Sequence, residues 1–99
     1  MANIRFPLGR AVFTRGALAT LTLQDVLTAA RRHSSCDWGD VCEEDARANE
    51  EALWEGARVL SAYTLPPPSS EAETLTPVKV WLITEADRSV TTILLPEEY

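Results

Sequence analysis

The chain has no long apolar run, only two cysteines, and the single histidine His33 among its 99 residues. A membrane span needs about 20 successive apolar residues, and the first ten residues lack the charged-then-apolar layout of a signal peptide. Cys36 and Cys42 lie six positions apart, so a disulfide between them would close a loop of little entropic value. These features predict a cytoplasmic protein with free thiols.

Positive charge is also scarce, because nine Lys and Arg residues face fifteen Asp and Glu residues, for a formal net charge of −6. Such a balance opposes binding to the nucleic-acid backbone and to anionic lipid. The four glycines are too scattered to form a loop that cradles a nucleotide phosphate. We therefore expect no direct nucleic-acid partner, no membrane partner and no cofactor.

What remains is the composition of one small folded domain. Hydrophobic residues make up 45% of the chain and charged residues 24%, which is unlike the composition of disordered chains. A chain of this length supports one modest core. Residues 66–76 hold three successive prolines followed by polar residues, which predicts a mobile surface loop within a single domain spanning residues 1–99.

Helical spacing predicts two main helices. After Thr22, the apolar residues Leu23, Val26, Leu27 and Ala30 share one helical face, and the last turn carries Arg31, Arg32 and His33, where the helix dipole favours cations. Asp40 and Glu43 have the spacing of a capping signal before a second helix at 41–56. Residues 16–21 are compatible with a short helical turn.

Strand patterns dominate the second half of the chain. Alternation at 57–65 and β-branched runs at 78–85 and 90–95 predict three strands, the last two joined by a tight turn. Residues 10–15 suit a short strand or an extended arm. The expected fold class is α+β, with two helices packed on one face of a small antiparallel meander of three or four strands.

The negative charge is concentrated in one segment. Residues 1–32 carry five Arg and one Asp, whereas residues 33–56 carry eight acids and one Arg. The acids are Asp37, Asp40, Glu43, Glu44, Asp45, Glu50, Glu51 and Glu55. Such a surface fits a basic groove that otherwise holds nucleic-acid phosphates, as in a DNA mimic, or it is a solvated face that keeps the protein soluble.

Two further features complete the predicted partner-binding surface. Trp38 lies beside these acids, either as an exposed anchor for a protein partner or folded back over the core. Asp87 and Arg88 occupy the predicted hairpin turn, either as an exposed recognition tip or as ordinary turn chemistry. Trp54 and Trp81 also need partners for their indole N–H groups.

Two other function classes stay open. A small enzyme or metal-binding protein would use His33, Cys36, Asp37, Asp40 and Cys42, although their spacing fits no standard zinc pattern and a Cys36–His33 dyad lacks an orienting third group. A self-associating protein, such as a homodimer, would pair an exposed edge of the predicted hairpin between subunits.

Several segments resemble a family of small bacterial proteins that occur on plasmids, integrative elements and prophages. The resemblance lies in Cys-Asp-Trp-Gly-Asp at 36–40, Asn49, Arg-Val-Leu-Ser-Ala-Tyr at 58–63 and the stretch 80–99 from Val-Trp-Leu-Ile-Thr-Glu to Leu-Leu-Pro-Glu-Glu-Tyr. It implies a mobile-element context, in which small acidic inhibitors of host restriction or CRISPR complexes are frequent, and it implies no catalytic residue. The resulting expectation is a non-enzymatic accessory protein that binds a host nuclease or defence complex.

Overall fold

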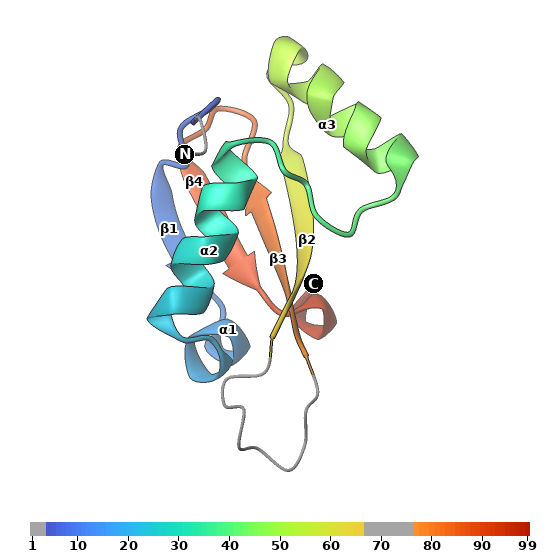
Figure 1. Ribbon diagram of the computed structural model, residues 1–99. Helices are drawn as coiled ribbons and strands as arrows, with labels where there is room; N and C mark the ends of the chain where they lie inside the picture. The colour runs from blue at the N-terminus through green and yellow to red at the C-terminus, as the bar shows by residue number, and fades with distance from the viewer. Residues whose placement is uncertain (1–3, 67–76) are drawn as a thin grey trace.

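A computed structural model describes residues 4–66 and 77–99 and shows an α+β domain built on one sheet (Figure 1). The strand order is β1-β4-β3-β2. The strands are β1 (Arg10–Phe13), β2 (Val59–Leu65), β3 (Val78–Thr84) and β4 (Val90–Leu94). Only the pair β1 and β4 is parallel. The predicted class is confirmed, with residues 10–13 as the fourth strand, while the predicted loop falls almost entirely on residues outside the described ranges.

Within residues 4–66 and 77–99, three α-helices and one 3-10 turn accompany the sheet. They are α1 (Arg15–Thr20), α2 (Leu23–Ser34), α3 (Glu43–Glu55) and η1 (Pro96–Glu98). A capping box begins α2, since Thr22 Oγ1 accepts from the Asp25 N–H while the Asp25 carboxylate accepts from the Thr22 N–H. In the described part of the chain, no helix has the length and apolar character needed to cross a membrane.

The main core lies between α2 and one face of the sheet. Alternate residues of β2 are buried there, as the period of two predicts. The core members are Ala17, Ala29, Tyr63, Leu65, Val80, Leu82 and Ile93. The buried side of α2 is centred on Ala29 and His33, whereas Leu23 and Leu27 are exposed. The prediction of a helix at this position is confirmed. The prediction of its buried face is wrong, because Leu23 and Leu27 of that face are exposed.

The second long helix, α3, lies along the outer edge of β2 instead of stacking beside α2 (Figure 1). The buried Asn49 side chain explains this placement, because it donates to the Leu60 carbonyl at 2.8 Å and accepts from the Leu60 N–H at 3.1 Å. Two residues further along β2, the Ala62 N–H donates to the Trp38 carbonyl, and the Ala62 carbonyl accepts from the Asp40 N–H. The edge groups of β2 at these two residues are thus satisfied.

Replacing Asn49 with Ala is expected to lower the free energy of unfolding by about 2 kcal/mol, because both backbone groups of Leu60 lose a partner in a partly buried place. Urea denaturation followed by circular dichroism measures this change. Arg47→Ala is the control, since Arg47 is exposed on the same helix and its change should stay within about 0.5 kcal/mol. A loss equal to that of the control would show that Asn49 does not hold α3 to the sheet.

The sheet order corrects the expectation that the hairpin offers a free edge for self-association. Strand β3 lies between β2 and β4, and β4 lies between β1 and β3. The expectation was wrong because it did not count β1 as a neighbour of β4. Homodimer formation through the β3–β4 hairpin is therefore not supported by this topology.

Candidate functional site

The surface of α3 that points away from β2 is acidic and carries one large aromatic side chain. Trp54 is 88% exposed. At 100° per residue, Trp54 lies on the same side as Glu43, Arg47 and Glu51 and opposite Asp45 and Ala52. The acidic face is defined by the exposed residues Glu43, Glu44, Arg47, Glu51, Trp54 and Glu55. Arg47 pairs with Glu43 at 3.8 Å near the start of the helix. Glu51 and Glu55 lie next to Trp54 at its C-terminal end.

The opposite side of α3 packs against the sheet and so holds the acidic face in position. Asn49 and Ala52 are buried against the sheet edge. Gly56 ends the helix in the left-handed conformation, with φ of 71°. Two glutamates and one aspartate in the first turn of α3 interact favourably with the helix dipole and stabilise the helix. The N-cap residue of α3 is Cys42, which makes no side-chain capping bond, so the prediction of a capping signal at Asp40 and Glu43 is wrong. The acidic face belongs to a helix that is anchored on its buried side and ended by Gly56.

Trp38 belongs to the interior, whereas Glu50 is a half-exposed residue of α3 whose carboxylate is engaged within the protein. Trp38 is 6% exposed, lies against Phe6 with ring centroids 6.1 Å apart, and meets His33 edge-on at 5.9 Å. Glu50 accepts from Trp38 Nε1 at 2.9 Å and from Arg5 Nη2 at 3.3 Å. The interpretation of Trp38 as an exposed anchor is wrong, because its indole N–H finds a partner in Glu50 and its rings complete a core cluster.

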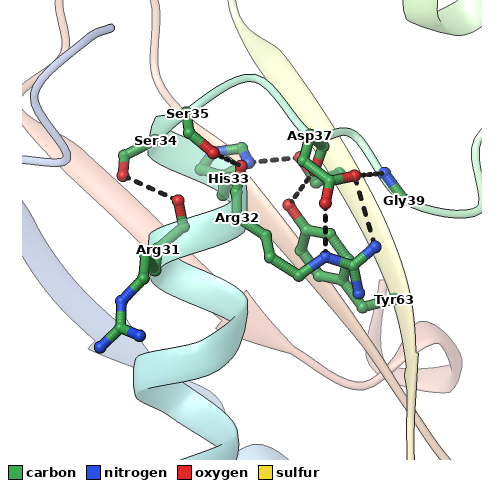
Figure 2. Close-up of polar contacts among 9 residues, drawn as sticks. Arg31, Arg32, His33, Ser34, Ser35, Asp37, Gly39 and Tyr63 are labelled. Atoms are coloured by element: carbon green, nitrogen blue, oxygen red, sulfur yellow. Dashed lines mark hydrogen bonds and ion pairs between the residues drawn. The ribbon is translucent and has the colours of Figure 1, made fainter. Parts of the chain in front are cut away.

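Asp37 and Asp40 hold the segment that joins α2 to α3, and Figure 2 shows the contacts of Asp37. The Asp37 carboxylate accepts from Arg32 Nε at 2.7 Å and from the Gly39 N–H at 3.2 Å, and the Asp37 carbonyl accepts from the Tyr63 hydroxyl. The hydrogen bond from Arg32 lowers the pKa of the Asp37 carboxyl. Asp40 accepts from the Thr64 hydroxyl. Both carboxylates are exposed, but each is already engaged within the protein.

The hairpin turn is structural. Asp87 accepts from both the N–H and the hydroxyl of Ser89, and these bonds lower the pKa of its carboxyl. Arg88 donates to the carbonyls of Ala52, Ala57 and Glu85. Its guanidinium thereby joins the hairpin to the C-terminal end of α3. The interpretation of Arg88 as a recognition tip is wrong for this reason.

The most deeply buried polar cluster is centred on His33, which the sequence places as a cation at a helix end. His33 is fully buried; its Nδ1 contacts Ser61 Oγ, and its Nε2 lies 2.8 Å from Thr84 Oγ1. Thr91 donates to the Leu8 carbonyl, so Thr84 donates to Thr91 and accepts the Nε2 proton of His33. Burial, followed by the charge of Arg88, lowers the pKa of His33 to about 4. His33 is therefore a neutral core histidine, and its interpretation as a helix-end cation is wrong.

The residues of the metal and enzyme alternative are held apart. Both nitrogens of His33 are engaged with hydroxyl groups, and burial raises the pKa of the Cys36 thiol, which disfavours the nucleophilic thiolate. Cys42 is exposed at the start of α3. Among residues 4–66 and 77–99, no three His, Cys, Asp or Glu side chains are placed to share a metal ion.

Trp54 is the site residue that sequence reasoning missed, although its position among glutamates at helical spacing was a usable signal. No protein-family model, curated protein or solved structure matches the chain.

Proposed function

We propose that the protein is a non-enzymatic accessory protein of a mobile genetic element that acts by binding a host defence complex in the cytoplasm. The contact surface is the acidic face of α3. The observation that carries this proposal is Trp54, exposed over 88% of its surface at the C-terminal end of α3, where Glu51 and Glu55 are also exposed. An exposed indole on an anchored helix is the kind of residue that dominates the energy of protein interfaces.

Charge complementarity selects the class of partner. The carboxylates of the acidic face would be repelled by nucleic acid and by anionic lipid, and attracted by a basic groove. Restriction and CRISPR complexes must carry such grooves, because they hold DNA or RNA phosphates. Occupation of the groove by α3 would exclude the nucleic acid and so inhibit the complex.

A purely solubilising surface is the competing explanation, and Trp54 argues against it. Carboxylates alone keep a protein soluble, whereas an exposed tryptophan works in the opposite direction. Trp54 lies outside both hydrophobic clusters of the fold. Its place on the acidic face is therefore explained better by a partner than by solubility or stability.

The proposal is tested in bacteria that carry a restriction or CRISPR system and are challenged with a sensitive phage. Expression of the protein is expected to raise the plating efficiency of the phage at least tenfold against the targeted system. The variant Glu44→Lys/Glu51→Lys should abolish this protection. The charge-matched control Glu71→Lys/Glu73→Lys, at positions outside the described residues, should preserve it.

The control distinguishes an effect of the acidic face from an effect of net charge, because both double variants change the net charge of the protein equally. Equal loss of protection in the two variants would contradict a specific role for α3. Absence of protection against every system in a panel that covers both classes would contradict the inhibitor proposal itself.

A further inference from the structure

A cleft of about 690 Å³ opens on the face of the sheet opposite α2. The side chains on this open face include Ala62 of β2 with its cross-strand neighbour Trp81 of β3, and Thr64 with its neighbour Lys79. The start of α3 and the C-terminal Tyr99 form the remaining walls. The cleft thus combines sheet, helix and chain end in a concave site, which is the usual shape of a ligand pocket.

Two aromatic rings make one corner of the cleft. The centroids of Trp81 and Tyr99 lie 5.3 Å apart, and the ring planes meet at 61°. Tyr99 is 67% exposed, and Trp81 is half-buried. In this edge-to-face contact each ring keeps a π-face that the other ring does not cover, and such faces attract organic cations.

Carboxylates supply the second half of a cation site. Asp40 and Asp45 both line the cleft, and Lys79 is the one cation among the described residues that line it. Lys79 lies opposite Thr64 in the strand register, and Thr64 donates to Asp40. The register thus places Lys79 beside Thr64 on the strands, whereas Asp45 enters the cleft from the first turn of α3.

We propose that this cleft binds an arginine side chain of a peptide or protein, with the guanidinium against Trp81 and Tyr99 and its charge balanced by Asp45. A planar, weakly hydrated guanidinium both stacks on aromatic rings and pairs with carboxylates, and its aliphatic stem suits the apolar floor at Ala62. The site is independent of the acidic face, because Asp45 and Trp54 lie nine residues apart and so on opposite sides of α3.

The test is a titration of the full chain with Nα-acetyl-arginine amide, followed by NMR of the three indole Nε1–H signals. The signals are assigned with Trp54→Phe and Trp81→Phe. The Trp81 signal is expected to shift saturably, with millimolar affinity, while the Trp54 signal stays in place. The citrulline analogue, which has the same shape without the charge, should not bind.

Three variants are expected to change the affinity for the arginine amide in stated directions. Tyr99→Ala, at an exposed position, should weaken binding about threefold through loss of one ring. Asp45→Asn should weaken it, and Lys79→Gln should tighten it, since a competing cation is removed. The proposal is overturned if Lys79→Gln weakens binding, if citrulline binds equally well, or if the Trp81 signal does not move. Tighter binding of tetramethylammonium than of the arginine amide would overturn the assignment to arginine. These outcomes leave the proposal for the acidic face unaffected.

Discussion

Lowering the pH from about 6.5 to about 4 is expected to reduce the free energy of unfolding by about 3 kcal/mol through His33 alone. In the folded protein the pKa of His33 is lowered to about 4, first by burial and then by Arg88, whereas in the unfolded chain it should be near 6.5. Between these values the unfolded state binds the proton and the folded state does not. The stabilising contribution of the neutral His33 to the free energy of unfolding is therefore fully present above pH 6.5. It is lost as the pH falls to about 4 and does not change further at lower pH.

Urea unfolding at a series of pH values between 7.5 and 4.5 measures this loss. The chain has one histidine, so the ring proton resonance of His33 in the folded protein gives its pKa directly. His33→Gln is the matched variant, because Gln offers one donor and one acceptor to Thr84 and Ser61. It should be less stable at neutral pH but show a flatter dependence between pH 6.5 and 4.5. An NMR midpoint near 6.5 would contradict a buried, neutral His33.

Replacing Trp54 with Ala is expected to weaken binding of the partner about 30-fold, or about 2 kcal/mol, with no change in melting temperature. Partner affinity should change without a change in melting temperature, because the exposed indole contributes little to folding but would be desolvated at the centre of an interface. Surface plasmon resonance with the inhibited complex and differential scanning calorimetry make the two measurements.

Trp54→Phe is the control for this prediction, since it keeps an aromatic ring and should recover part of the affinity. Trp81→Phe, on the open face of the sheet, should leave partner binding unchanged. Binding unaffected by Trp54→Ala would remove Trp54 from the interface. A drop in melting temperature of more than a few degrees would show that the side chain has a structural role.

The fold class followed from local patterns, because apolar period and turn chemistry are properties of short segments. The strands at 57–65, 78–85 and 90–95 were predicted almost at their observed limits. The parallel pairing of β1 with β4 was not predictable in this way, since it joins residues about 80 positions apart in the chain. Local periodicity carries no information on such long-range pairing.

The site was predicted in part, and the failures concern which side chain faces which neighbour. The acidic helix was predicted from composition, but Trp38, predicted as a partner-binding residue, is buried, and the exposure of Trp54 was not predicted. Trp38 is buried because Glu50 lies within reach of its indole and Phe6 packs beside it, and both contacts are set by tertiary structure. His33 likewise became a core residue only because Ser61 and Thr84 of two different strands converge on it.

Competition with nucleic acid for the inhibited complex tests directly whether the acidic face of α3 occupies a basic groove. Fluorescent DNA or guide-bound target is placed on the purified defence complex, and its release is followed by anisotropy as the protein is added. We expect full displacement by the unaltered protein and by Glu71→Lys/Glu73→Lys, with affinity falling steeply as the salt concentration rises. Glu44→Lys/Glu51→Lys should displace at least tenfold less effectively. Inhibition with the nucleic acid still bound, or equal displacement by both double variants, would contradict the claim that the acidic face of α3 occupies a basic groove.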